Sequence, residues 1–187
     1  MEIYLDIDFL HRPYGFNKNF LDTEPEYEDE LFKLISPDDI DYAPRYFMDE
    51  FYECIKKEAQ QKEYIQQMIA FDKVKLVSSF VLLYEILQNP VLHAREKNKQ
   101  FIVKHSTKYI SSNKANEIVK ITQDIMNFDP IRWKDAMRLS CAIYANCDYF
   151  ISYDYNEKYN MKNLLKYLNS KLKIITPSNF IILTEKL

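Results

Sequence analysis

The stretch KVKLVSSFVLLYEILQNP, residues 73–90, decides the fold class. Its first part, KVKLVSS, is typical of a short strand, and FVLLYEILQN follows it directly with the apolar character of a helix. Ser78 or Ser79 is the expected N-cap of this helix. Asn89 and Pro90 end it, because the residue before a proline disfavours helical angles. A strand that runs straight into a helix predicts an α/β protein.

The same alternation of strand and helix extends in both directions along the chain. Three more strands are predicted, at EIYLDI (2–7), DYFIS (148–152) and KLKIIT (171–176). Helices are predicted over 44–71, 91–109, 113–127, 130–146 and 156–169, with a last turn after Pro177. Strands separated by helices imply a parallel sheet with right-handed crossovers. Because such sheets bind ligands beyond the carboxyl ends of their strands, the residues just after each strand matter most.

Length and composition set further limits. The 187 residues fit a single domain, 1–187, within which we interpret 17–70 as an enlarged acidic loop and helix insert. The single glycine, Gly15, excludes glycine-rich phosphate loops. No stretch has the apolar length of a membrane span, and the N-terminus lacks the features of a signal peptide. We therefore expect a cytoplasmic protein with no membrane partner.

Charge is distributed unevenly, although the net charge is only −3. Residues 22–50 hold eleven acids, whereas 93–120 hold seven lysines or arginines and 158–173 hold five lysines. Such asymmetry predicts a basic face that can bind nucleic acid. The alternative is that these are ordinary solvated helix faces.

Carboxylates occur where the predicted strands end and within two apolar helices. Asp6 and Asp8 follow the first strand, Asp154 follows DYFIS, and Glu85 and Asp135 stand among apolar helical residues. Each alone can be a cap or half of a salt bridge, but burying unpaired charge is costly. Carboxylates gathered in one crevice raise each other's pKa values, and a divalent cation removes that conflict. Mg²⁺ and Mn²⁺ prefer such oxygen ligands and can promote phosphodiester hydrolysis.

Four segments carry a resemblance to a known family. YLDIDFLHRP (4–13), VSSFVLLYEILQNP (77–90), KDAMRLSCAIYANCDYFISYD (134–154) and IITPSNF (174–180) resemble, in order and spacing, the bacterial PIN-domain proteins that begin with a Y-L-D-x-x-x-x-x-R-P pattern. These are related to VapC-type toxin ribonucleases. The resemblance implies a three-layer α/β/α sandwich around a parallel sheet of four to five strands. It also implies a ribonuclease that uses Mg²⁺ or Mn²⁺.

The resemblance assigns roles to individual residues. It implies that Asp6 is a direct metal ligand, and that Glu85 is a ligand or a base that orients water. Asp135 matches the aspartate of the family's D-A motif, and Asp154 matches the aspartate after the third strand. All four are therefore expected to be catalytic.

Four other residues are supporting features or departures. Ser152 stands where the family often has a serine or threonine that supports the last aspartate, and Arg12 is expected to face a phosphate or to be structural. Asp8 replaces a smaller polar residue, and a fifth acid there can tighten metal binding or displace the usual water arrangement. Arg138 replaces a common histidine. As a cation three residues from Asp135, it can pair with Asp135 and weaken its role as a ligand.

Two other functions compete with the ribonuclease. The chain can be a catalytically inactive PIN-like module that binds RNA or protein. The D-I-D pair also resembles haloacid-dehalogenase-type phosphatases, in which the first aspartate attacks phosphorus, but the late acidic pair near glycines is missing. The partners implied by the resemblance are RNA, an antitoxin protein and a second copy of the chain.

Overall fold

The computed structural model describes residues 1–11, 45–128, 131–153 and 161–185. The chain divides into two compact units, one formed by Met1–His11 with Ile65–Leu187 and the other by Arg12–Tyr64. Of the predicted insert at 17–70, the described part is helix α5 (Arg45–Ala70), which matches the helix predicted over 44–71. The predicted acidic loop before it lies outside the described residues. The candidate site belongs to the first unit.

This unit is built on a sheet of five strands in the order β3-β2-β1-β4-β5, with every neighbouring pair parallel. The strands are β1 (Glu2–Leu5), β2 (Lys75–Ser79), β3 (Ser106–Ile110), β4 (Tyr149–Ile151) and β5 (Lys173–Ile175). The central strand is the most buried, since Ile3, Tyr4 and Leu5 are fully inaccessible. That burial is typical of parallel sheets covered on both faces. The predicted α/β class with a parallel sheet is confirmed.

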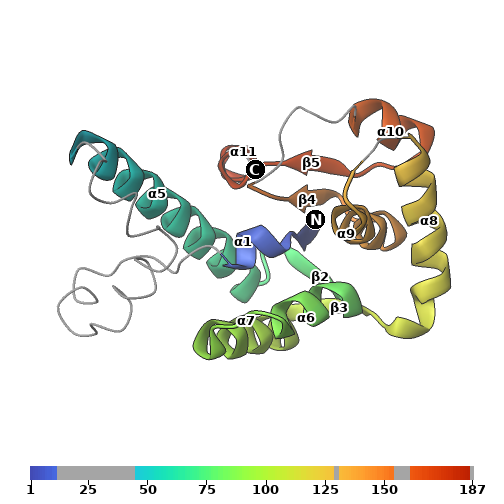
Figure 1. Ribbon diagram of the computed structural model, residues 1–187, viewed down its shortest axis with the longest axis horizontal. Coiled ribbons are helices and arrows are strands. Elements are labelled where there is room, and N and C mark those ends of the chain that lie inside the picture. The colour runs from blue at the N-terminus through green and yellow to red at the C-terminus, as the bar shows by residue number, and fades with distance from the viewer. Residues whose placement is uncertain (12–44, 129–130, 154–160, 186–187) are drawn as a thin grey trace. The chain divides into compact units, whose positions relative to one another are not determined.

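Helices connect the strands and flank the sheet (Figure 1). Besides α5 they are α1 (Ile7–His11), α6 (Phe80–Leu87), α7 (Leu92–His105), the 3-10 turn η1 (Ser112–Lys114), α8 (Ala115–Phe128), α9 (Trp133–Tyr144), α10 (Met161–Tyr167) and α11 (Pro177–Thr184). The path β1-β2-β3 runs one way across the sheet, and β4 and β5 lie on the other side of β1. With right-handed crossovers, the helices of these two halves cover opposite faces, as in a three-layer sandwich.

Strand β3 corrects the prediction of one helix over 91–109. Helix α7 ends at His105 and β3 begins at the next residue, with no loop between them. Ser106 has an extended backbone, with ψ of 121°, and its hydroxyl donates to the Ile102 carbonyl, 2.6 Å away. β3 pairs only with β2, and its middle three residues are exposed. It therefore lacks the apolar pattern that identifies a buried strand.

The ends of the other elements depend on short-range chemistry. The side chain of Ser79, not Ser78, caps α6 by accepting a hydrogen bond from the Leu82 N–H. Pro177 opens α11, where its missing N–H costs nothing, and Thr176 is the cap. β1 ends one residue before Asp6, so the predicted strand at 2–7 is too long. The described residues contain no helix of the length and apolar character needed to cross a membrane.

A chain with one glycine must end its helices in another way. Asp72, Asn146 and Asn169 have φ angles of 57°, 59° and 48°, in the left-handed region. They follow α5, α9 and α10, where the chain turns toward a strand. Behind Asn146, the Cys147 N–H donates to the Ala142 carbonyl at 3.0 Å, which satisfies a carbonyl at the helix end. Asn and Asp tolerate this conformation best among non-glycine residues.

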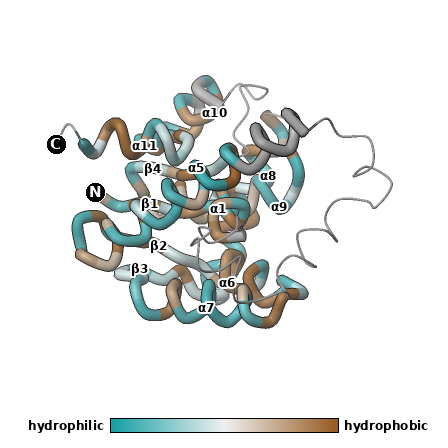
Figure 2. The backbone as a smooth tube through the Cα atoms, turned by 90° about the vertical axis from the view of Figure 1, so that its left-hand side faces the viewer, coloured by the Kyte–Doolittle hydropathy of each residue, from teal (hydrophilic) through white to brown (hydrophobic). Residues whose placement is uncertain are grey.

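The hydropathy of the helices differs strongly from one to the next (Figure 2). Only two of the eight residues of α6, Tyr84 and Glu85, have polar groups in their side chains. Its buried residues are Val81, Leu82, Glu85 and Ile86. α7 is mainly hydrophilic and buries only Asn98 and Ile102. Glu85 is thus the one carboxylate in an otherwise apolar helix that packs into the core.

Candidate functional site

The candidate site lies at the carboxyl edge of the sheet, between β1 and β4. These strands are neighbours, and the strand order changes direction between them. Asp6 follows β1 directly, and its N–H donates to the Ile151 carbonyl at 2.9 Å. Ser152 and Tyr153 follow β4. A switch point of this kind is where open α/β sheets usually bind ligands.

Asp8 joins the two segments that leave β1 and β4. It lies in the first turn of α1. Its Oδ2 accepts hydrogen bonds from the Tyr153 N–H at 2.8 Å and from the Ser152 hydroxyl at 3.1 Å. Its Oδ1 accepts one from the Phe9 N–H at 2.6 Å. Asp8 therefore holds the end of β4 next to α1.

Arg138 lies among three carboxylates from three different elements. Its Nε is 2.9 Å from Oδ1 of Asp6, and its Nη1 is 3.7 Å from Oε2 of Glu85. Its Nη2 donates a hydrogen bond to Oδ1 of Asp135. The side chains of Arg138, Asp6 and Glu85 are 9–10% exposed, whereas that of Asp135 is 42% exposed. We call these four residues the Arg138 cluster.

The local sequence explains how these side chains meet. Asp135 and Arg138 are one turn apart on α9, so their side chains emerge from the same helical face. Glu85 is on α6, which packs against α9. Asp6 directly follows the central strand, and its side chain contacts Arg138 of α9. The sheet order therefore gathers residues that are up to 132 positions apart in the sequence, from Asp6 to Arg138.

The burial of these acids shifts their proton affinity. Burial raises the pKa of Asp6 to about 7, and the negative charge of Asp8 adds to this, although Arg138 and the hydrogen bonds from Ser152 and Ile7 act in the opposite direction. Burial also raises the pKa of Glu85, and the positive charges of Arg138 and Lys134 oppose that shift. The two carboxyl groups hold their protons more tightly than in water, because one guanidinium does not compensate for burial and crowding.

Arg138 neutralises the acids without satisfying all of their hydrogen bonds. Among the described residues, its Nε–H has no hydrogen-bond acceptor in good geometry despite the short distance to Asp6, and Oε2 of Glu85 has no donor. Both atoms are buried. Only the contact with Asp135 is a hydrogen bond. Unsatisfied buried polar atoms are costly, so the guanidinium fits this site imperfectly.

A second polar network lies next to the cluster. The hydroxyls of Tyr4 on β1 and Ser79 at the cap of α6 are 2.6 Å apart, and both side chains are buried. The Cys141 thiol interacts with both hydroxyls, and its burial raises its pKa to about 11, so it stays protonated at neutral pH. This network joins β1, α6 and α9 and fixes the positions of the elements that carry Asp6, Glu85 and Arg138.

The structure brings together three of the four predicted ligands, Asp6, Glu85 and Asp135. The fourth, Asp154, and the predicted phosphate contact Arg12 lie outside the described residues. Ser152 follows β4 and donates to Asp8, whereas its predicted support of Asp154 involves a residue outside the described ones. The predicted pairing of Arg138 with Asp135 is present as a hydrogen bond. Among the described residues, no group of three His, Cys, Asp or Glu side chains has the arrangement of a metal site.

Sequence reasoning missed two parts of this site. The ion pairs of Arg138 with Asp6 and Glu85 were not predicted. The position of Arg138 among the buried, mainly apolar residues of α9 indicated that it needs an acidic partner. The Tyr153 amide that holds Asp8 has no side-chain signature at all.

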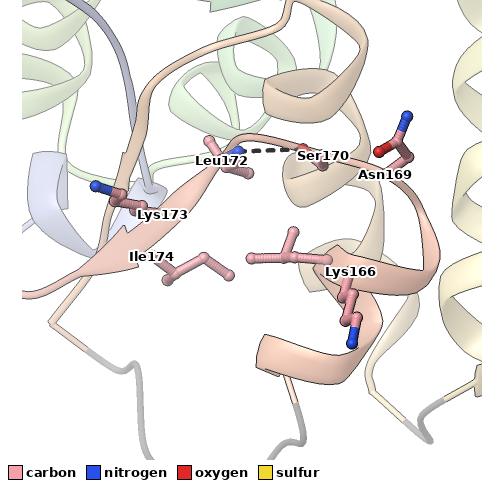
Figure 3. A pocket seen from close by; sticks show the side chains of 7 residues that line it. Lys166, Asn169, Ser170, Leu172, Lys173 and Ile174 are labelled. Carbon is pink, nitrogen blue, oxygen red and sulfur yellow. Dashed lines mark hydrogen bonds between the residues drawn. The ribbon is translucent and has the colours of Figure 1, made fainter.

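A pocket elsewhere in the unit does not belong to this site. It lies between α10 and β5, where Leu165, Leu172 and Ile174 supply apolar walls. The side chains of Lys166 and Lys173 extend in different directions (Figure 3). None of the acids of the Arg138 cluster lines it.

No family model, no curated protein and no solved structure matches the chain.

Proposed function

We propose that the chain is a metal-dependent ribonuclease of PIN-domain type, which hydrolyses RNA phosphodiester bonds with Mg²⁺ or Mn²⁺. The observation that carries the proposal is the convergence of Asp6, Glu85 and Asp135 at the switch point of a parallel sheet. Bringing three acids together, with two of them buried, lowers the stability of the fold. Such arrangements therefore indicate a function other than stability. Cation binding is such a purpose.

The charge of the site supports a cation as the ligand. Within the described residues, the carboxylates of Asp6, Glu85 and Asp135 surround the guanidinium of Arg138, and Asp8 adds its negative charge next to Asp6. Lys134 contributes at longer range to Glu85. The acids outnumber the cations. Burial is the main cause of the raised pKa values of Asp6 and Glu85, and the charges of Asp8 and Asp135 add to the shifts of Asp6 and Glu85 respectively. A divalent ion would reverse both pKa shifts.

The donor set suits such an ion in kind. Carboxylate oxygens are the ligands that Mg²⁺ and Mn²⁺ prefer, and Oε2 of Glu85 is buried without a hydrogen bond. Asp6, Glu85 and Asp135 would hold the ion, with Arg138 withdrawn from between them. A bound ion would polarise a phosphoryl oxygen and make water a better nucleophile. The chain's own contribution is to hold the acids in place, with Asp8 fixing the segments that follow β1 and β4.

An RNA substrate is favoured by the charge of α7. This helix carries four basic residues (Arg95, Lys97, Lys99, Lys104) and one acid, Glu96. Its buried Asn98 donates to the Leu10 carbonyl at 3.0 Å, so α7 is anchored to α1, which carries Asp8. A basic helix beside an acidic site attracts a polyanion and leaves the acids free to hold the ion.

The experiment is a cleavage assay on labelled single-stranded RNA with Mn²⁺. The wild-type chain should cut the RNA, and Asp6→Asn and Glu85→Gln should each lose at least about 100-fold in rate. Asp124→Asn is the matched control, because Asp124 is an exposed acid of α8. Cleavage that survives both site substitutions, or intact RNA with every variant, would contradict the proposal.

A second candidate, a non-catalytic PIN-like module, is favoured by the hydrogen bond between Arg138 and Asp135. In that case Arg138 takes the place of the ion permanently. The module predicts RNA retention that is independent of Mn²⁺ and of Asp6→Asn, with no cleavage. The phosphatase alternative predicts a phosphoryl group trapped on Asp6, and the three hydrogen bonds to the carboxylate of Asp8 disfavour it as a proton donor.

An antitoxin partner and a homodimer stay predictions of the resemblance. Several apolar side chains of α6 and α7 are exposed, among them Tyr84, Leu87 and Leu92. Light scattering on the purified chain tests the dimer. Co-expression with the product of a small neighbouring gene tests the antitoxin.

A further inference from the structure

The Arg138 cluster points to a role for Arg138 that concerns the ion rather than the substrate. The guanidinium lies between the carboxylates that would hold a divalent cation, and it contacts all three of them. A guanidinium and a divalent ion cannot share that position. We propose that Arg138 is a built-in competitor of the metal ion, which stabilises the ion-free protein and sets the ion concentration that the site requires. The inference rests on the proposed function.

The first support is the position of the charge. Within the described part of the chain, Arg138 is the cation that forms ion pairs with both buried acids, at 2.9 Å from Asp6 and 3.7 Å from Glu85. Without it, these two carboxyl groups would lose the positive charge that lowers their pKa values. The ion-free fold therefore depends on Arg138, because uncompensated buried charge is strongly destabilising.

The second support is the imperfect fit of the guanidinium. The Nε–H of Arg138 and Oε2 of Glu85 are buried without hydrogen-bond partners in the described part of the chain, and Glu85 is only 8% exposed. A residue selected only to neutralise these acids would be expected to satisfy them in bidentate geometry. An unpartnered, buried carboxylate oxygen that faces a displaceable cation is suited to exchange that cation for another.

The third support is the asymmetry of exposure. Asp135 holds the guanidinium by a hydrogen bond, and its side chain is 42% exposed, whereas Asp6 and Glu85 are about nine-tenths buried. The hydrogen bond of Arg138 within the cluster is thus at its solvent side. Water and ions can compete for Asp135 first, which gives the guanidinium a route out of the site.

Competition has a measurable consequence. When only a fraction of the molecules has the guanidinium withdrawn, the apparent dissociation constant of the ion rises by the inverse of that fraction. Removing the arginine removes this penalty. We expect Arg138→Gln to bind Mn²⁺ at least about tenfold more tightly than the wild type, and to unfold at a lower temperature when no ion is present.

The test is isothermal titration with Mn²⁺ alone, together with thermal unfolding in the presence of EDTA and of Mn²⁺. The variants are Arg138→Gln, which removes the positive charge, and Arg138→Lys, which keeps the charge but lacks the planar guanidinium group. The matched control is Arg132→Gln, because Arg132 precedes the same helix and is exposed. It changes the net charge equally and should leave the affinity within about twofold of the wild type.

Each outcome is decisive. Tighter Mn²⁺ binding by Arg138→Gln, with Arg138→Lys in between and Arg132→Gln unchanged, supports the inference. If Arg138→Gln unfolds in EDTA but folds in Mn²⁺, that result supports it too. Equal affinity for the wild type and both Arg138 variants overturns it while the metal site stands. Absence of Mn²⁺ binding in every variant overturns both the inference and the metal-dependent function.

Discussion

Replacing Asp8 tests the tether between the ends of β1 and β4. Its carboxylate accepts hydrogen bonds from the Tyr153 N–H and the Ser152 hydroxyl, at 2.8 and 3.1 Å. A hydrogen bond to a charged acceptor contributes ~1.5–3 kcal/mol, and the lower end applies because Asp8 is only partly buried. Asp8→Ala removes both hydrogen bonds and also relieves the repulsion with Asp6, so we expect the free energy of unfolding to fall by up to about 3 kcal/mol.

Asp8→Asn separates the hydrogen bonds from the charge. The amide oxygen can still accept from the Tyr153 N–H, and the loss of charge relieves the repulsion that raises the pKa of Asp6. These effects oppose each other, so the expected change is within about 1 kcal/mol. Urea unfolding of both variants, with the exposed Asp124→Ala as control, measures the difference. An Asp8→Ala variant as stable as the wild type would refute the tether.

Three further predictions concern other parts of the first unit. The pKa of Asp6 is about 7 in the folded chain, against an ordinary aspartate value of 3.8, so the folded state binds the proton more tightly than the unfolded state. The contribution of Asp6 to the free energy of unfolding should therefore be largest at about pH 4 and below. It should fall by up to about 4 kcal/mol as the pH rises to 7 and above. Asp6→Asn removes that part of the pH profile, and identical pH slopes for variant and wild type, measured by urea unfolding without ions, would contradict the prediction. Asn146→Ala should cost ~1–2 kcal/mol, because its φ of 59° suits alanine poorly, whereas Asn146→Gly should be neutral or stabilising; a thermal melt in which the two variants coincide would count against it. Ser79→Ala should cost ~2–3 kcal/mol, since it removes the cap of α6 and a partner of the Tyr4 hydroxyl, and Tyr4→Phe, which keeps the cap, should cost less in the same urea titration.

The sheet was predictable where burial imposes a pattern on the sequence. β1, β2, β4 and β5 all lie within predicted strands, because apolar runs bounded by polar residues identify buried strands. β3 was not predictable by that rule. It is an exposed edge strand in a lysine-bearing segment, and it follows α7 without a glycine or proline between them. Its place is set by pairing with β2, which is a tertiary interaction.

The site was predictable as a set of acids and not as an arrangement. Asp6, Glu85 and Asp135 could be named because carboxylates at strand ends and in apolar helices are exceptional. The contacts of Arg138 with Asp6 and Glu85 depend on how α6 and α9 pack against the end of β1, and sequence spacing contains no such information. The spacing of three residues did predict the one local contact, between Arg138 and Asp135.

The pairing of β1 with β4 also determines the order in which the contacts of the site can form during synthesis. β1 is made first, but Asp8 must wait for Tyr153, 145 residues later, before its tether can close. Arg138 likewise emerges long after Asp6. Contacts so distant in sequence form late, because the intervening chain has to be ordered before they are gained. The Arg138 cluster therefore cannot assemble until Arg138 itself has been made, so Asp6 and Glu85 leave the ribosome before the cation that compensates their charge.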